Sequence, residues 1–498
     1  MEFFQNIYLA FSLALSPNNL LFALIGGLVG FMIGVLPGFG PAAGIAVLTP
    51  LTFSMEPTPA MIMLATIYAA AFYGGAVTAI LLNVPGEAAA VVTALEGYQL
   101  AKKGRAGAAL GMSAIASAIG GGFGTLVFML FAPLLAKVAF EFGPAEFFSL
   151  VFFALTFVIL LSERNLLKGL IATLFGLLMS GVGIDIISGA ERFTFGMFWL
   201  TAGIDFLAVL IGVFAVSEIF MSIEESIKGI AYKGKIAGML PTKEDWRQSL
   251  GALLRGSAIG TFVGVLPGAG ATIASFLSYG VEKRLSKHPE KFGTGVIEGL
   301  AGPECANNSV CAGAMIPTFT LGIPGGSTTA VMLGALILHG LRPGPNLFID
   351  HHNIIWGLIG GMYIGNLIAL LIGLTCVPIF VQILRIPYSM LTGIILPLCV
   401  IGIYSVNIST IELWFILFFG AIGYGMRKLG FPPVVFVLAF ILGPLMEVSL
   451  RQALIIFNGR VKGFFQNPVS AFLLFFSFFM IVLNLILLQR KGSRNAEA

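Results

Sequence analysis

A short apolar motif with one proline and three glycines occurs twice in this chain, and it restricts the possible folds more than any other feature. The first copy, GVLPGFG, spans Gly34–Gly40, and the second, GVLPGAG, spans Gly264–Gly270. Proline removes a backbone donor, and glycine lets the backbone leave helical geometry. Inside hydrocarbon, a broken backbone persists only where protein or a water-filled cavity satisfies its polar groups. Two matched breaks are typical of the binding site of a secondary transporter. The alternative is an ordinary proline kink in each of two membrane helices.

The composition places the chain in a lipid bilayer. Of its 498 residues, 58% are hydrophobic and only 10% are charged, whereas a soluble protein has about 25% charged residues. A spanning helix needs about 20 apolar residues, and the chain contains roughly a dozen such runs. The sequence therefore predicts an all-α polytopic membrane protein with about 12 transmembrane segments. The net charge of +4 is too small to indicate nucleic-acid binding.

The repeat is wider than the Pro-Gly motif. Matching residues at an offset of 230 are Leu20, Gly26, Gly30 and Gly34 with Leu250, Gly256, Gly260 and Gly264. A second shared motif pairs LNVPG, ending at Gly86, with LGIPG, ending at Gly325, at an offset of 239. We therefore divide the chain into an N-terminal interfacial helix (1–17), a first repeat (18–223), a cytoplasmic linker (224–250), a second repeat (251–447) and a C-terminal transmembrane helix with a basic tail (448–498).

The distribution of basic residues gives each repeat a direction. The second Pro-Gly segment has Lys and Arg on both flanks, and the first has neither. Because basic residues favour the cytoplasmic side, both ends of the second segment are expected in the cytoplasm. The pattern predicts two inverted repeats, each with a re-entrant hairpin or broken helix, whose tips meet near the midplane. The alternative is that each segment is one kinked span.

The breaks and the glycine-rich motifs after them are the candidate substrate site. Glycine-rich backbone before a helix start presents free N–H groups and the positive end of the helix dipole, which favour an anion such as a carboxylate. Capping of the helix by Ser327 or Thr328 is an alternative role for those hydroxyls. The candidate residues are Pro37, Gly38, Gly40, Pro85, Gly86, Pro267, Gly268, Gly270, Pro324, Gly325, Gly326, Ser327 and Thr328.

A polar stretch at residues 298–309 is the candidate cation site. Its carboxylate and amide oxygens suit a hard cation such as Na⁺, and an ionisable residue at membrane depth is a functional candidate. The candidate ligands are Asn83, Asn307, Asn308 and Glu304. Because few lysines or arginines accompany the breaks, a multivalent anion would need a cotransported Na⁺ or H⁺ to enter a low-dielectric site. The alternative is a polar loop at the membrane interface that caps a helix beginning near Ser309.

Other functional classes lack their motifs in this sequence. It contains no Walker A motif and no Ser/His/Asp or Cys/His arrangement, so neither an ATP-driven pump nor an enzyme is expected. No cofactor is predicted. The four cysteines have no zinc spacing and are expected to be buried thiols. They are Cys305, Cys311, Cys376 and Cys399.

Together these motifs resemble the large membrane subunit of the tripartite tricarboxylate transporters. The resemblance rests on GVLPGFGP (34–41), NVPG (83–86), GVLPGAG (264–270), GPECANN (302–308) and PGGSTT (324–329). It implies a multi-pass permease of the bacterial inner membrane with a small membrane subunit and a periplasmic solute-binding protein as partners. It also implies uptake of a di- or tricarboxylate such as citrate, driven by an ion gradient. An uncoupled channel or a structural subunit of a larger complex is the alternative.

Overall fold

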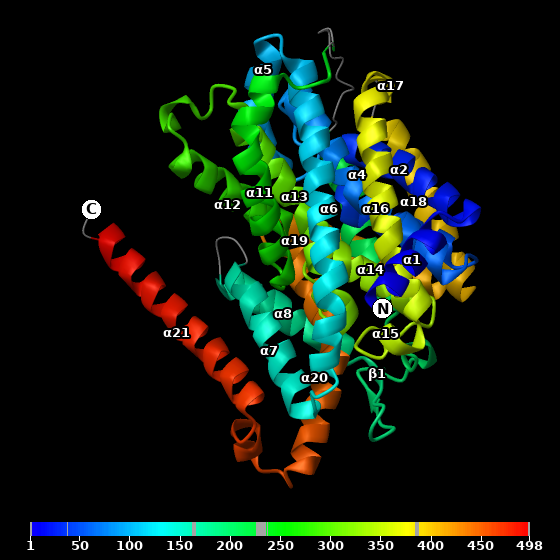
Figure 1. The fold of residues 1–498 in the computed structure, drawn as a ribbon. Helices are drawn as coiled ribbons and strands as arrows, with labels where there is room; N and C mark the ends of the chain where they lie inside the picture. The colour runs from blue at the N-terminus through cyan, green and yellow to red at the C-terminus, as the bar shows by residue number, and fades with distance from the viewer. Residues whose placement is uncertain are drawn as a thin grey trace.

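The computed structural model describes residues 2–36, 38–161, 166–225, 236, 238–383 and 388–496, and it is helical nearly throughout (Figure 1). The exception is a small ladder in which β1 (Gly183–Ile184) pairs antiparallel with β2 (Glu191–Arg192). The helices are α1 (Glu2–Ala14), α2 (Pro17–Val35), α3 (Gly40–Leu48), η1 (Thr49–Thr52), α4 (Pro57–Leu82), α5 (Ala90–Lys102), α6 (Ala106–Ala139), α7 (Pro144–Leu161), α8 (Leu166–Ser180), η2 (Phe198–Leu200), α9 (Phe206–Leu210), η3 (Ile211–Val216), α10 (Ser217–Glu225), α11 (Lys243–Val265), α12 (Gly270–Leu285), η4 (Pro289–Lys291), α13 (Ile297–Leu321), α14 (Ser327–Leu338), α15 (Leu347–Asp350), α16 (His352–Thr375), α17 (Val377–Ile383), α18 (Tyr388–Asn407), α19 (Ile411–Lys428), α20 (Pro433–Ile456), η5 (Val461–Phe465) and α21 (Pro468–Ala496).

Seven helices in the described part of the chain are long and apolar enough to cross a membrane. They are Pro17–Val35, Pro57–Leu82, Ala106–Ala139, Pro144–Leu161, Phe206–Glu224, His352–Thr375 and Pro433–Ile456. Several apolar helices are shorter, including α8 and α14, and α3 together with η1 forms another. The fold is therefore that of a polytopic membrane protein, as the composition predicts.

Both Pro-Gly motifs interrupt a helix. The first break separates α2 from α3, and the second separates α11 from α12. Gly38 and Gly40 have φ of +82° and +60°, and Gly268 and Gly270 have φ of +73° and +62°. These left-handed conformations are the ones that glycine adopts without steric cost. The matched dihedrals show that the backbone leaves the helix in the same way in both halves. Pro37 itself lies outside the described residues.

Matched glycines bring α2 against α4 and α11 against α13. A Cβ on any of these six glycines would lie within 2.9 Å of a carbonyl oxygen of the partner helix. The contacts are Gly26 with Met63, Gly30 with Ile67, Gly34 with Ala71, Gly256 with Gly302, Gly260 with Ala306 and Gly264 with Val310. The glycines differ by 230 positions and their partners by 239, which are the offsets of the two sequence motifs. Glycine at these positions permits the close helix packing typical of membrane bundles.

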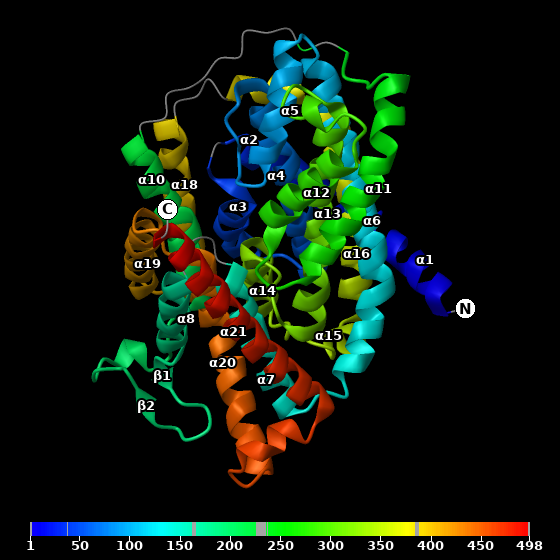
Figure 2. The same ribbon diagram turned by 90° about the vertical axis from the view of Figure 1, so that its left-hand side faces the viewer.

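The helices α4, α6, α13 and α16 pack against one another (Figures 1 and 2). Glycines of α6 and α16 show the pairing, because Gly120 faces Cys305 of α13 and Gly365 faces Thr66 of α4. These contacts are also equivalent, since Thr66 and Cys305 are 239 positions apart. The α4 helix runs antiparallel to α6, while α6 runs parallel to α13. Between α4 and α6, Tyr73 hydrogen-bonds Leu110, whereas Ala65, earlier in α4, lines a small cavity with Gly121, later in α6. Between α6 and α13, Gly120 lies next to Cys305, and Gly124, later in α6, lies next to Ser309, later in α13. The two matched helices α4 and α13 therefore run in opposite directions.

We expect Gly120→Ala to lower the free energy of unfolding by about 1–3 kcal/mol, the usual cost of overpacking. The added Cβ would lie 2.1 Å from the carbonyl oxygen of Cys305, which cannot move without the α13 backbone. Gly122→Ala is the control, because no atom lies within 4 Å of its Cβ position and alanine favours the helix. Thermal unfolding of the purified protein in detergent measures both, and equal effects would contradict this packing.

An ion pair joins the start of α11 to the loop before α6. Asp245 is 3% exposed, and its two carboxylate oxygens accept hydrogen bonds from Arg105 at 2.7 and 2.8 Å. Thr242 completes a capping box with Asp245, which satisfies two N–H groups at the start of α11. Burial raises the pKa of Asp245, but the hydrogen bonds from Arg105 and Thr242 outweigh it and hold the pKa below its usual value.

This depressed pKa predicts an acid-sensitive contribution to stability. A carboxyl group with a lowered pKa in the folded state stabilises the fold above its unfolded pKa of about 4, and the contribution is lost as the pH falls below that value. We expect the unfolding temperature of Asp245→Asn to be lower than that of the unmodified protein at pH 7. The difference should shrink as the pH falls below about 4. A difference that does not change with pH would contradict this role of Asp245.

Candidate functional site

One hydrogen bond in each half ties the Pro-Gly break to the loop that follows the next long helix. The N–H of Gly38 donates to the carbonyl of Gly86 at 3.1 Å, and the N–H of Gly268 donates to the carbonyl of Gly325 at 2.9 Å. The two donors are 230 positions apart in the sequence, and the two acceptors are 239 positions apart, as in the two repeated motifs. The structure therefore joins the four segments predicted to bind substrate into two equivalent pairs of loops.

The glycines that accept these bonds are packed too tightly to carry a side chain. A Cβ on Gly86 would lie 2.3 Å from the carbonyl oxygen of Gly34, and a Cβ on Gly325 would lie 2.7 Å from that of Gly264. Each loop is thus held against the end of the helix that precedes the break. This packing fixes the position of the backbone groups at both breaks.

The second loop leads directly into α14. Gly326 is extended, and its N–H donates to Thr329 Oγ1 at 3.0 Å. Thr329 therefore caps this helix start, in place of Ser327 or Thr328. Within the described contacts the Ser327 hydroxyl has no hydrogen-bond partner. The N–H groups of the first turn of a helix have no intrahelical acceptor. Ser327 and these N–H groups are therefore suitable donors for an anion.

Two side-chain contacts cross between the halves beside the loops. Asn307 of α13 donates through Nδ2 to Glu87, in the loop before α5, at 3.1 Å. Tyr68 of α4 lies beside the side chain of Thr328 at the start of α14. Tyr68 and Asn307 are themselves 239 positions apart, so each half sends one polar side chain to the loop of the other. The Asn307 Oδ1 atom is buried and has no hydrogen-bond partner among the described residues.

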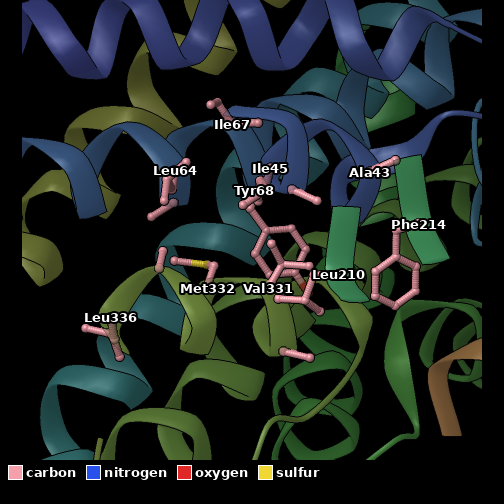
Figure 3. Packing of buried hydrophobic residues seen from close by; sticks show 14 of the residues in the cluster. Ala43, Ile45, Leu64, Ile67, Tyr68, Leu210, Phe214, Val331, Met332 and Leu336 are labelled. Carbon is pink, nitrogen blue, oxygen red and sulfur yellow. The ribbon is translucent and has the colours of Figure 1, made fainter. Parts of the chain in front are cut away.

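The surroundings of Tyr68 show how the halves meet (Figure 3). Its ring packs in an apolar cluster with Ile45 of α3, Val331 of α14 and Leu210 of α9. The helix that follows the first break therefore packs against the helix that follows the second loop. Gly38 also approaches a charged pair, because a Cβ there would lie 2.7 Å from Oε1 of Glu218, which is bound to Arg427.

The polar stretch at residues 298–309 is inside a buried helix. α13 runs unbroken from Ile297 to Leu321, so the alternative of an interfacial loop that caps a helix near Ser309 is wrong. Glu304 is fully buried, and its carboxylate accepts hydrogen bonds from Thr93, from Ser113 at 2.8 Å and from Ser117 at 3.4 Å. Its described contacts thus supply three hydroxyls and no cation.

The four candidate cation ligands do not form one group. Asn308 lies one turn after Glu304 and donates to its carbonyl oxygen at 3.5 Å. Asn307 contacts the loop at Glu87 instead. Asn83 is exposed and ends α4 in a left-handed conformation, as Gly322 does at the equivalent end of α13. The local role of Asn83 is therefore to terminate a helix.

A cavity of about 740 Å³ was not predicted from the sequence. It lies between the segment around the β-ladder, the loop at Pro343–Pro345 and α20, and the candidate site residues are not among its lining. Four charged residues on its wall form a network: Arg451 with Asp185 at 2.7 Å and Glu447 at 3.2 Å, and Arg192 with Glu447 at 2.6 Å. Hydrogen bonds from Ser188 and Arg451 lower the pKa of Asp185. Glu447 and Arg451 are four positions apart on α20, but Asp185 and Arg192 are more than 200 positions away, so no local pattern indicates the whole network.

Comparison with known proteins gives a family and no structural relative. No solved structure matches the chain. A protein of Agrobacterium vitis, described as an uncharacterized 52.8 kDa protein in the TAR-I ttuC′ 3′ region, is 44% identical over 487 residues, which cover 98% of this chain and 97% of that protein. A second protein of Agrobacterium vitis, described as an uncharacterized protein in the TAR-II ttuC′ 3′ region, is 43% identical over 227 residues, 46% of this chain and 94% of that protein.

The family model covers nearly the whole of both repeats. Residues 20–438 match the model of the tripartite tricarboxylate transporter TctA family. This range includes both breaks and both loops that carry the matched hydrogen bonds. The chain therefore belongs to the tripartite tricarboxylate transporter TctA family, as its large membrane subunit, and it is a transporter component and not an enzyme.

Proposed function

We propose that this subunit carries a di- or tricarboxylate such as citrate across the bacterial inner membrane by secondary active transport coupled to Na⁺ or H⁺. The observation that carries the proposal is the matched pair of breaks, with the Asn307–Glu87 and Tyr68–Thr328 contacts crossing between them. A periplasmic solute-binding protein delivers the substrate, and a small membrane subunit completes the complex. Both partners are inferred from the family alone.

We interpret the two halves as inverted repeats. The antiparallel direction of α4 and α13 supports this, and so do contacts at the open ends of the two broken segments. Thr52, at the end of the first segment, hydrogen-bonds His339 after α14 at 3.2 Å. Tyr279, near the end of the second segment, donates to Glu96 of α5 at 2.8 Å. The open end of the first segment therefore lies beside the end of α14, and that of the second lies beside α5. In this proposal each segment is a re-entrant hairpin that opens on its own face of the membrane.

The substrate site in this proposal is built mainly from backbone. The loops at Gly38 and Gly86, and at Gly268 and Gly325, hold the helix starts at which N–H groups and the Ser327 hydroxyl bind carboxylate oxygens. A multivalent anion there is not matched by a surplus of basic side chains, so a bound cation compensates its charge. Asn308 and Glu304 are the oxygen donors proposed for that purpose.

Transport in proteoliposomes tests this function. The subunit is reconstituted with its small membrane subunit, the binding protein is added on the outside, and uptake of radiolabelled citrate, malate and tartrate is measured under an inward Na⁺ gradient or an inward H⁺ gradient. We expect saturable uptake that one of the gradients drives against the substrate gradient, and counterflow into vesicles preloaded with unlabelled substrate. Uptake that only follows the substrate gradient, without counterflow, would favour an uncoupled channel.

A further inference from the structure

Two small cavities lie side by side between α4, α6, α13 and α16, and no residue of either break lines them. Each has a volume of about 10 Å³, close to the space that one water molecule or one small ion requires. Asn366 of α16 lines both. The first cavity also has Ser117 and Asn308 in its wall, and the second has Thr66 and Cys311. The structure thus places amide and hydroxyl groups around a space of ionic size between α4, α6, α13 and α16.

The amides at these cavities are buried and have few partners. Asn308 is 1% exposed and Asn366 is 7% exposed. The structure gives one hydrogen bond for the Asn308 side chain, a donation to the Glu304 carbonyl at 3.5 Å, and gives none for Asn366 within the described residues. Burial of an amide without partners costs about 1–3 kcal/mol in proteins. A bound ligand that takes up the two amide oxygens would remove this cost.

The packing reserves space for Asn366. A Cβ on Gly121 would lie 2.2 Å from Asn366 Oδ1 and 2.7 Å from its Cγ, so only glycine leaves room for the amide. The matched contacts of Gly120 and Gly365 also make Gly121 and Asn366 equivalent positions in the two halves. In the same way Ala65 and Ala69 of α4 are equivalent to Glu304 and Asn308 of α13. One half therefore supplies small residues where the other supplies polar ones.

A buried carboxyl group lies next to the cavity. Ser117, which lines the cavity, hydrogen-bonds the Glu304 carboxylate at 3.4 Å. A carboxylate in the bundle centre is costly unless a positive charge accompanies it. Hydroxyl, amide and carboxylate oxygens are the ligands that hard cations prefer, and the described residues form no cluster of His, Cys, Asp and Glu that would suit a transition metal.

We propose that one Na⁺ binds between Ser117, Asn308 and Asn366, with Glu304 as the compensating charge. This inference rests on the proposed ion-coupled transport and specifies its ion site. It adds Ser117 and Asn366 to the cation ligands and leaves out Asn83, which is exposed, and Asn307, which belongs to the loops. Asn308 and Asn366 both lie in the second half, and their equivalents in the first half are Ala69 and Gly121. The first half therefore cannot form a second site of this kind.

Equilibrium binding of ²²Na⁺ to the purified subunit in detergent tests the site without any substrate. We expect saturable binding that Asn308→Ala and Asn366→Ala each weaken by about tenfold or more, the loss expected for removing a hydrogen-bonding group from a charged ligand. Ser117→Ala should also weaken binding. Asn353→Ala is the control, since Asn353 is exposed on the same helix, α16, and its affinity should be unchanged.

The wild-type protein alone can refute the proposal. If it shows no saturable ²²Na⁺ binding, or if binding is the same in both asparagine variants, the site is wrong. Where an alanine variant does not fold, Asn366→Ser keeps an oxygen at the position and should bind Na⁺ with intermediate affinity. Substrate counterflow that persists without Na⁺ binding would overturn this inference and leave the proposed function standing. Intact Na⁺ binding without counterflow would overturn the function instead.

Discussion

Gly325→Val is expected to abolish carboxylate uptake while the protein still folds. The new Cβ would lie 2.7 Å from the carbonyl oxygen of Gly264 and 2.7 Å from the Cβ of Ala314, and valine adds two further methyl groups. The loop must therefore move, and its hydrogen bond from the N–H of Gly268 is lost. In enzymes a misplacement of about 1 Å costs about 100-fold in rate, and we expect a loss of at least that order in uptake.

The matched control for this variant is Gly122→Val. Its Cβ position on α6 has no atom within 4 Å, so the same change of side chain meets open space. Size-exclusion chromatography and thermal unfolding show whether each variant is folded, and citrate counterflow in proteoliposomes shows whether it transports. Gly86→Val, the equivalent change in the first half, should behave like Gly325→Val. Normal counterflow by both loop variants would show that the loops do not form the substrate site.

Asn307→Leu is expected to reduce uptake by about 10- to 100-fold, because it removes a hydrogen bond to a carboxylate in a buried setting. Leucine is close to asparagine in shape but cannot donate to Glu87, so the contact between α13 and the loop before α5 is lost. Since the bond joins the two halves, its loss should change transport more than it changes stability. The change in counterflow rate and the change in unfolding temperature are measured on the same preparation.

A double-mutant cycle separates this contact from a general effect of the substitution. If Asn307 acts through Glu87, then Asn307→Leu combined with Glu87→Gln should lose less than the sum of the two single losses. Asn353→Leu, an exposed change on α16, serves as the control and should transport normally. Fully additive losses in the cycle would contradict a functional Asn307–Glu87 contact.

The sequence predicts the repeat and its breaks well because their physical cause is local. Glycine is required where a carbonyl oxygen of the neighbouring helix lies within 3 Å of the position that a Cβ would occupy, as at Gly30 and Gly260. The matching pattern of glycines in the two halves is visible in the sequence alone. Gly38 and Gly268 adopt left-handed conformations that glycine accommodates without steric cost, so the glycines of the motif also mark the breaks. The offsets of 230 and 239 come from two short motifs. The same offsets relate the contacts between α2 and α4 to the contacts between α11 and α13.

Features that depend on distant contacts could not be predicted. Asn366 is an isolated amide in an apolar helix, and its role follows only from its place beside Gly121 and Asn308. The network of Arg192, Glu447 and Arg451 joins segments more than 200 positions apart. The stretch at residues 298–309 was open to interpretation as a loop, because its proline, glycines and asparagines are poor helix formers in water. Packing against α5, α6 and α11 makes it a helix.

The loops of both halves are proposed to enclose one substrate site. The most direct test places a single cysteine at Ala88 or at Ser327, one in each half, in a protein whose four native cysteines are replaced by serine or alanine. The rate of modification by a small thiol reagent is then measured with and without the di- or tricarboxylate that drives counterflow. If one site is shared, this substrate slows modification at both positions with the same half-saturating concentration. Protection at only one position, or at neither, would contradict it.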